Sequence, residues 1–157
     1  MSDCCSVKNT DSKNSPQTVS CPHCQEKGKP VDILILKSLL ITDAMKRLDL
    51  SHPYQFCRTS DCPIVYFNGS ASFSKDDLVV EVFQKGNLDS TPTCYCFGFD
   101  RKRIIDDVHQ NGKSTIQEQV KQYVKDKKCA CEIRNPQGSC CLGNILQVIN
   151  QSSSLKQ

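Results

Sequence analysis

The sequence predicts an α+β fold in which a small, mostly β unit is followed by a small helical unit. In the first half of the chain, short runs of β-branched and aromatic residues are separated by turn residues, a pattern typical of strands. After Gly86-Asn87, with Pro92 in the connection, apolar residues recur at the three- and four-residue spacing of helices. The length of 157 residues fits one compact domain or two small ones, since a domain has roughly 100–200 residues.

These patterns divide the chain into four segments. Residues 1–20 are almost entirely polar, and such a composition predicts a disordered arm. Residues 21–88 form the β-rich unit, and residues 89–150 form the helical unit. Residues 151–157 are again polar and are expected to form a flexible tail.

The β-rich unit is expected to contain four short strands and one short helix. Val31 to Leu36 is aliphatic and β-branched, and it is short enough for a strand. Further strands are predicted at residues 54–56, 64–67 and 78–83. Asn68-Gly69 is a turn signal after the third strand. Residues 42–48 favour one or two helical turns, which Ser51-His52-Pro53 ends.

Three helices are expected in the helical unit, over residues 100–110, 114–127 and 141–149. Asp100 can cap the first of them, and Gly112 can end it. Ser114 and Gln117 have the spacing of a capping box for the second. The third carries apolar residues on one face, so it is expected to pack inward.

The charge of the chain argues against nucleic-acid binding. Lys and Arg number 20 and Asp and Glu 17, so the net charge is only +3 and is mixed along the sequence. Signs of an ordinary enzyme are also missing, because His109 is the only histidine of the helical unit and no nucleophile with its base can be identified. We therefore expect neither a nucleic-acid-binding protein nor an enzyme.

The chain contains 12 cysteines, whose role depends on the cellular compartment. The first residues, Met1-Ser2-Asp3-Cys4-Cys5-Ser6, show no basic region followed by an apolar stretch, so no secretory signal is expected. The longest apolar run, Ile33 to Leu36, is far shorter than the ~20 residues that cross a bilayer. We expect a soluble, cytoplasmic protein without membrane insertion, in which closely spaced cysteines bind metals rather than form disulfides.

Two cysteine pairs lie in the β-rich unit. They are Cys21 with Cys24, a C-x2-C pair, and Cys57 with Cys62, a C-x4-C pair. Tetrahedral Zn²⁺ binds four thiolates, and this spacing lets two sulfur atoms of each pair reach one ion. Four protein ligands leave no open position, so the prediction is a structural zinc site. Two alternatives stay open: His23 or His52 replaces one sulfur, or the first pair is a redox-active C-x-x-C motif.

A second set of cysteines belongs to the helical unit. Its candidate ligands are Cys94, Cys96, Cys131 and Cys140. The two irons of a [2Fe–2S] cluster need two thiolates each, so a close pair followed by a more widely spaced pair fits it better than it fits a single small ion. A second structural zinc remains an alternative, with Cys129, Cys131 and the Cys140-Cys141 pair as its ligands.

Four stretches of the chain are similar to one known family. They are Cys21-Pro-His-Cys24, Tyr54-Gln-Phe-Cys57 through Cys62-Pro-Ile-Val-Tyr-Phe67, Cys94-Tyr-Cys96, and Cys131 through Cys141. Together they resemble the N-terminal domain of CopZ-type copper chaperones, whose cluster-binding half is similar to the bacterioferritin-associated ferredoxins. The resemblance covers residues 20–148.

The resemblance implies two metal centres. Zn²⁺ is held by Cys21, Cys24, Cys57 and Cys62, and a [2Fe–2S] cluster by Cys94, Cys96, Cys131 and Cys140. It favours iron–sulfur over a second zinc. Two ligand choices stay open, because the residues concerned are close in the sequence. Cys129 can replace Cys131, and Cys141 can replace Cys140. We favour Cys131, which keeps the family-like interval to Asn135-Pro136.

The resemblance also implies a role in copper homeostasis. In this hypothesis one cluster electron reduces Cu²⁺ to Cu⁺ before a heavy-metal-associated copper carrier or a copper-transporting ATPase accepts it. Full-length members carry copper on an M-x-C-x-x-C loop. This sequence does not contain that motif, since its methionines are Met1 and Met45. Thiols outside the two ligand sets are candidates for transient Cu⁺ contacts, namely Cys4, Cys5, Cys129 and Cys141.

The alternative hypothesis is a ferredoxin-like electron carrier or redox sensor without a copper function. Its partner is then an electron-donor reductase or an iron-storage protein. The sequence does not decide between the two hypotheses, because the potential of a cluster depends on hydrogen bonds to sulfur and on exposure.

Overall fold

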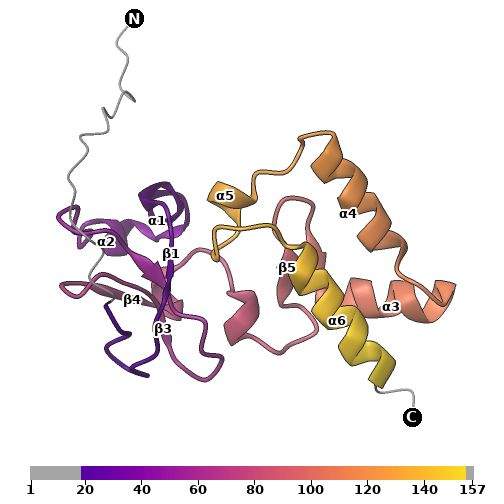
Figure 1. Cartoon of the computed structure of the whole chain (residues 1–157), viewed down its shortest axis with the longest axis horizontal. Helices are drawn as coiled ribbons and strands as arrows, with labels where there is room; N and C mark the ends of the chain where they lie inside the picture. Colours follow the sequence, from indigo (N-terminus) through magenta and orange to yellow (C-terminus); the bar gives the residue numbers. More distant parts are fainter. Residues whose placement is uncertain (1–18, 155–157) are drawn as a thin grey trace, which may run out of the picture.

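A four-stranded antiparallel sheet forms the first part of the molecule (Figure 1). The computed structural model describes residues 19–154, so Cys4, Cys5 and nearly all of the expected N-terminal arm lie outside the described residues. The strands are β1 (Lys29–Pro30), β2 (Gln55–Phe56), β3 (Ile64–Phe67) and β4 (Ser72–Ser74), in this order across the sheet. The strand predictions at β2 and β3 are confirmed, whereas β1 and β4 were not predicted.

A tight turn joins β3 to β4. The side-chain oxygen of Asn68 accepts hydrogen bonds from the backbone N–H groups of Ser70 and Ala71, at 3.0 and 2.8 Å. Gly69 has a φ of +88°, a conformation that glycine adopts without steric cost. The turn predicted at Asn68-Gly69 is confirmed.

Residues 33–39 form a helix, α1 (Ile33–Leu39), so the strand predicted at residues 31–36 is wrong. Asp32 begins the helix, because its carboxylate accepts a hydrogen bond from the N–H of Leu34 at 2.8 Å. The buried side chains are Ile35, Leu36 and Leu39. Leu34 is 52% exposed, so the apolar run includes a residue on the solvent-facing side of the helix as well as the buried ones. A short aliphatic run does not distinguish a strand from a buried helix, and this ambiguity explains the error.

The strand predicted at residues 78–83 is also wrong. This segment makes one isolated antiparallel bridge, between Leu40 and Leu78, and is flanked by two 3-10 helices, η1 (Lys75–Asp77) and η2 (Phe83–Lys85). Leu78, Val82 and Phe83 are buried, whereas Val79 is 60% exposed. Burial of three side chains therefore accounts for most of the apolar pattern without an extended strand. The short helix predicted at residues 42–48 is confirmed as α2 (Thr42–Met45).

Helices dominate the second part of the molecule, which follows a two-stranded hairpin (Figure 1). The elements are β5 (Pro92–Cys94), β6 (Phe99–Asp100), α3 (Arg101–Asn111), α4 (Thr115–Lys125), α5 (Cys131–Arg134) and α6 (Leu142–Ser154). The predicted caps are confirmed: Asp100 accepts from the N–H of Arg103 at 2.9 Å, and Ser114 from that of Gln117 at 3.0 Å. Gly112, in the left-handed conformation, ends α3.

Helix α6 is longer than predicted. It continues through Ser154, so residues 151–154, which the sequence analysis assigns to the flexible tail, are helical. The hydroxyl of Ser152 donates to the backbone carbonyl of Ile149 at 2.8 Å, and the side chain is buried. Since serine is neutral to unfavourable within a helix, the burial of Ser152 explains the extension of the helix better than its hydrogen bond does.

Separate clusters of buried apolar side chains stabilise the two parts. In the first part, α1 packs on the sheet with four aromatic residues, Tyr54, Phe56, Tyr66 and Phe73. In the second part, α6 packs against α3, α4 and β5. This mixture of sheet and helix confirms the predicted α+β class. Among the described residues, none of the helices has the length and apolar character needed to cross a bilayer.

Candidate metal centres

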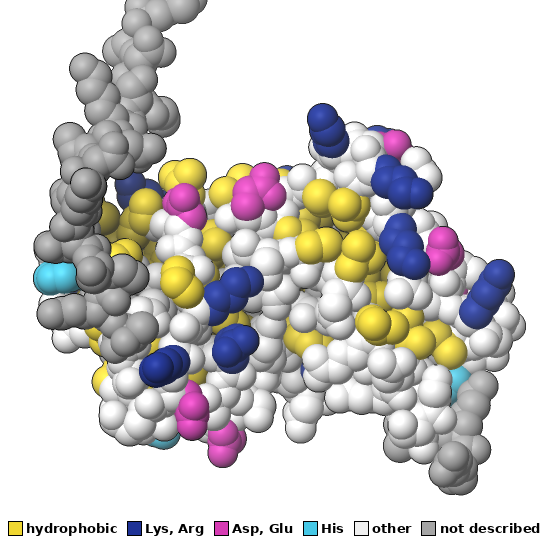
Figure 2. All heavy atoms as spheres, viewed as in Figure 1, with side chains coloured by type: hydrophobic (Ala, Val, Ile, Leu, Met, Phe, Trp, Pro, Cys, Tyr) yellow, Lys and Arg dark blue, Asp and Glu magenta, His cyan; other side chains and the backbone are white. Residues whose placement is uncertain are grey.

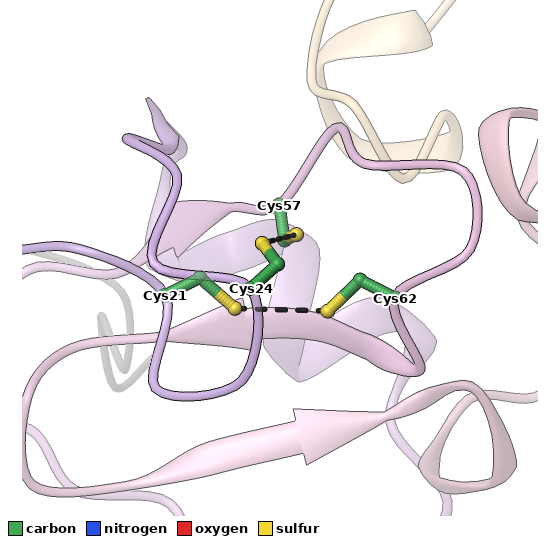
Figure 3. A group of neighbouring side chains, drawn as sticks. All are labelled: Cys21, Cys24, Cys57 and Cys62. Carbon is green, nitrogen blue, oxygen red and sulfur yellow. Dashed lines mark hydrogen bonds between the residues drawn. The ribbon is translucent and has the colours of Figure 1, made fainter.

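Four cysteines of the sheet region, residues 19–79, come together at one point (Figure 3). The Sγ atoms of Cys21, Cys24, Cys57 and Cys62 all lie within 4.8 Å of one another. The Sγ atoms of Cys21 and Cys62 are 3.8 Å apart, and those of Cys24 and Cys57 are 3.6 Å apart. A tetrahedron with Zn–S bonds of about 2.3 Å has S–S edges of about 3.8 Å, so the four sulfur atoms fit one zinc ion.

Two backbone loops position these thiols. Cys21 opens a turn in which its carbonyl accepts from the N–H of Gln25 at 3.0 Å and its own N–H donates to the carbonyl of Glu26 at 2.9 Å. Cys57 follows β2, and its N–H donates to the carbonyl of Val65 in β3 at 2.8 Å. Cys62 closes the loop between these strands just before β3. The sheet therefore fixes one pair of sulfur atoms, and the turn presents the other pair to them.

Burial disfavours free thiolates at two of these cysteines. Burial raises the pKa of Cys62 to about 12, and burial also raises the pKa of Cys21. At Cys24 burial acts in the same direction, but a hydrogen bond from the Thr59 hydroxyl and backbone hydrogen bonds outweigh it and lower the pKa to about 7. Four buried or half-buried sulfur ligands that need a compensating positive charge match the chemistry of a closed site for a soft divalent cation.

The two histidines considered as replacement ligands differ in position. The Nδ1 atom of His23 lies 3.6 Å from the Sγ of Cys62, next to the group. His52 bonds instead to the hydroxyl of Ser51 at 2.8 Å on an exposed loop. Since the four sulfur atoms already complete a tetrahedron, His23 is a neighbour of the site, and His52 takes no part in it.

A second group of thiols lies where the β5–β6 hairpin meets α5 and α6. The Sγ atoms of Cys96 and Cys131 are 3.7 Å apart, and the backbone N–H of Ala130 donates to the Cys96 sulfur at 3.2 Å. Cys94, Cys131 and Cys141 are buried in the same apolar cluster, and the Cys141 thiol lowers the pKa of both Cys94 and Cys131. Cys141 therefore belongs with Cys94, Cys96 and Cys131 in one group of thiols.

This second group is more extended than the first. Elsewhere in the described part of the chain, no three ligand atoms of His, Cys, Asp or Glu lie within 4.8 Å of one another. An extended row of four thiols matches a two-iron cluster, whose irons each take two thiolates, better than it matches a single tetrahedral ion. The residues present therefore fit a [2Fe–2S] cluster.

Of the two adjacent cysteines between which the sequence left the choice open, the structure places Cys141 in the same buried cluster as Cys94 and Cys131. Cys141 is 1% exposed and packs among the buried side chains of the helical region, residues 92–154. Cys140 is exposed. The two residues are adjacent at the start of α6, so their side chains point in different directions and only one of them reaches Cys94 and Cys131.

Hydrogen bonds polarise this thiol group. The hydrogen bond with Cys141 lowers the pKa of Cys131 to about 6 and also lowers the pKa of Cys94. The same contacts raise the pKa of Cys141, with Cys131 the largest cause. Burial raises the pKa of Cys96 to about 11. Cys129 is half-buried and packs against the cluster that holds this group, and burial raises the pKa of its thiol.

Comparison with known proteins supports the zinc assignment. Residues 18–79, which contain all four cysteines of the first group, match the family model zf_CopZ, described as "Zinc binding domain". A solved structure, the N-terminal domain of CopZ from Archaeoglobus fulgidus, superposes with a TM-score of 0.70 at 25% sequence identity. The match covers 83% of this chain and 97% of that one. The chain is similar to CopZ in both sequence and fold.

This finding confirms the resemblance to CopZ-type proteins that the cysteine motifs predict. The CopZ structure spans the helical region as well as the sheet region, since 83% of the chain is covered. The similarity to bacterioferritin-associated ferredoxins remains a prediction. No curated protein sequence matches the chain.

Proposed function

We propose that this chain is a metal-handling protein related to copper chaperones, and that it is not an enzyme. The observation that carries the proposal is the group of four cysteine sulfur atoms within 4.8 Å of one another, inside a segment that matches CopZ-type zinc-binding domains. The division into residues 21–88 and 89–150 belongs to the proposal, with one metal centre in each part.

In the proposed protein, Zn²⁺ is held by Cys21, Cys24, Cys57 and Cys62. Four thiolates leave the ion no open position, so its role is structural. Its site joins the turn before β1 to the loop between β2 and β3. Zinc binding then stabilises the sheet directly.

The second centre is a [2Fe–2S] cluster held by Cys94, Cys96 and Cys131, with Cys141 as the fourth ligand in place of Cys140. Apolar side chains surround these thiols and limit the access of water, among them Phe97, whose ring lies 4.5 Å from that of Tyr123. The N–H of Ala130, at 3.2 Å from the Cys96 sulfur, is placed to stabilise a thiolate there.

A bound [2Fe–2S] cluster that an electron donor has reduced by one electron would supply that electron to one Cu²⁺, giving Cu⁺ and the oxidised cluster. Cu⁺ is a soft ion that thiolates select, so reduction prepares copper for a thiol-based acceptor. The acceptor is a heavy-metal-associated carrier or a copper-transporting ATPase, and we place the reaction in the cytoplasm. Cys140, exposed beside the second thiol group, and half-buried Cys129 are the described thiols outside both ligand sets.

The charge of the visible surface agrees with a protein partner better than with nucleic acid. Figure 2 shows Lys and Arg side chains separated from one another and interspersed with uncharged and acidic ones on this face. Nucleic-acid surfaces usually carry a continuous basic stripe.

The experiment is an anaerobic preparation analysed for zinc, iron and acid-labile sulfide, followed by titration of the reduced protein with Cu²⁺. We expect one zinc and two irons per chain, and one equivalent of Cu²⁺ should reoxidise the cluster, with Cu⁺ recovered on a thiol acceptor. If the cluster forms but Cu²⁺ neither oxidises it nor binds, the copper function fails and the electron-carrier alternative replaces it. A preparation without iron and sulfide after reconstitution overturns the cluster itself.

A further inference from the structure

The loop that carries two thiols of the second group rests on the sheet region. This loop, residues 131–141, begins with α5 at Cys131 and ends at Cys141. Tyr66 of β3 is fully buried, and its hydroxyl donates to the backbone carbonyl of Pro136 at 2.7 Å. The donor and the acceptor are 70 positions apart, so this bond joins the sheet directly to the middle of the loop.

Two further contacts hold the same loop. The Nζ of Lys29 in β1 donates to the hydroxyl of Ser139 at 2.7 Å. Gly138 packs so closely on α1 that an added Cβ would lie 2.7 Å from the Cδ1 of Ile35. Helix α5 contacts α1 (Figure 1). Contacts from β1, β3 and α1 therefore converge on one short segment between Cys131 and Cys141.

The other segment with thiols of the second group is tied to the four-cysteine site. The Nζ of Lys85, in η2, donates to the backbone carbonyls of Thr59 and Cys62, at 2.7 and 3.0 Å. Both acceptors belong to the loop that presents Cys57 and Cys62. From Lys85 the chain leads to β5, where Cys94 is located.

From this arrangement we propose that the sheet region positions the second thiol group, with Tyr66 and Lys29 as positioning residues for the loop between Cys131 and Cys141. The proposal rests on the proposed function only in naming the second group as a cluster site. A metal ion between the turn before β1 and the loop between β2 and β3 steadies the strands that carry Lys29 and Tyr66. The influence runs mainly in one direction, from the zinc site to the cluster site, since all four zinc ligands lie within the sheet region, whereas the loop between Cys131 and Cys141 depends on contacts from that region.

Two tyrosines make a matched test of this proposal. Tyr66→Phe removes only the hydroxyl that reaches Pro136. Tyr54→Phe removes the hydroxyl of another buried tyrosine, which accepts instead from the N–H of Asp49 at 3.1 Å, a part-buried bond within the sheet region. Both variants lose one hydrogen bond and keep a buried aromatic ring, so they differ mainly in which segment loses its partner.

The first measurement is hydrogen exchange on the full, zinc-loaded chain. Two amides report on the loop: Asn135, which donates to the carbonyl of Cys131 at 3.1 Å, and Gly138, which donates to that of Asn135 at 2.8 Å. Losing one buried hydrogen bond raises the equilibrium constant for local opening of the loop roughly fivefold, and the exchange rate rises in proportion. We expect Tyr66→Phe to speed exchange over residues 131–141 by that factor with the zinc content unchanged, and Tyr54→Phe to leave it at the wild-type rate.

The second measurement uses the reconstituted, iron-loaded protein. We expect Tyr66→Phe to change the visible circular dichroism of the cluster and to speed iron release to a chelator by roughly fivefold. Tyr54→Phe should change neither, and Lys29→Met should act like Tyr66→Phe. Equal exchange rates over residues 131–141 in the wild type and in Tyr66→Phe overturn the proposal, as do equal effects of both tyrosine variants. A chain that takes up no iron overturns the cluster assignment, while the exchange rates still decide the positioning role.

Discussion

The Sγ atom of Cys96 lies 3.7 Å from that of Cys131, although 35 positions separate the two residues in the sequence. This contact joins the β5–β6 hairpin to the start of α5. Cys141, just before α6, is buried in the same cluster as Cys131 and Cys94 and is the fourth thiol of this group. The second candidate centre therefore depends on three separate elements, whereas the first depends on a turn and one loop between paired strands.

Adjacent cysteines at the start of α6 allow a direct test of the fourth cluster ligand. Cys141→Ser replaces a buried thiol in the same cluster as Cys94 and Cys131, so we expect it to abolish the visible absorption and the bound iron. Cys140→Ser replaces an exposed thiol and should keep both within measurement error. The readouts are the absorption spectrum and the iron and sulfide content after anaerobic reconstitution. If Cys140→Ser bleaches the protein and Cys141→Ser does not, the ligand that the sequence analysis favours is correct.

The two metal centres should respond unequally to the loss of one ligand. Cys57→Ser opens the four-sulfur site, so we expect zinc release and unfolding of the sheet region, since metal-binding energy contributes directly to folding. The loop of residues 131–141 loses its support in this variant, and the cluster should be lost as well. Cys96→Ser should bleach the protein and leave zinc bound.

Zinc and iron contents, with far-ultraviolet circular dichroism, measure both variants. Retention of a normal cluster in the zinc-free Cys57→Ser protein contradicts the dependence of the cluster site on the sheet region. Loss of zinc from Cys96→Ser contradicts the direction of that dependence.

Local signals made much of the fold predictable. Asp100 and Ser114 were identified as helix caps because their side chains act within three residues, at the N–H groups of Arg103 and Gln117. The turn at Asn68-Gly69 was equally local. The helix at residues 33–39 was missed, because a run of four aliphatic residues carries no clear period and only packing against the sheet decides its form.

The candidate sites show the same limit. Short spacing identified the pairs Cys21 with Cys24 and Cys57 with Cys62, because two sulfurs in one tight turn are close in any fold. The choice between Cys140 and Cys141 depends on the direction in which α6 starts, which the sequence does not encode locally. The bond from Tyr66 to Pro136 spans 70 positions and carries no sequence motif, so only the structure reveals it.

Asp107 is expected to stabilise the junction of α3 and α4. Its carboxylate accepts hydrogen bonds from the Ser114 hydroxyl at 3.2 Å, the N–H of Ile116 at 3.0 Å and the hydroxyl of Thr115. Asp107→Ala should cost about 1–2 kcal/mol of unfolding free energy at pH 7. Asp106→Ala is the control, since Asp106 makes one exposed pair with Lys102 and its loss should cost less than about 0.5 kcal/mol.

The cost of losing Asp107 should depend on pH. Burial acts to raise the pKa of Asp107, but the hydrogen bonds from Thr115, Ile116 and Ser114 outweigh it, so the pKa in the folded state lies below its ordinary value. A lowered folded pKa gives stability that is fully present above the unfolded value of about 3.9 and is lost as the pH falls through the folded pKa. Thermal unfolding from pH 7 down to acid pH should show the difference between wild type and Asp107→Ala shrink only below about pH 4. A difference that stays constant throughout contradicts the role of the charge.

Gly138 and Gly112 form a matched pair for testing the close approach of the loop to α1. Both have a positive φ, +70° and +71°, so alanine introduces similar backbone strain at either position. An added Cβ meets nothing within 4 Å at Gly112 but lies 2.7 Å from the Cδ1 of Ile35 at Gly138.

Gly112→Ala should cost about 1 kcal/mol of unfolding free energy, which is the backbone strain alone. Gly138→Ala should cost a further ~1–3 kcal/mol, because Ile35 is fully packed in the core and cannot move aside freely. Denaturant unfolding of the zinc-loaded variants measures both costs, and hydrogen exchange should show that Gly138→Ala alone loosens residues 131–141. Equal costs for the two variants, with the loop equally protected in both, mean that the loop does not rest on α1 in solution.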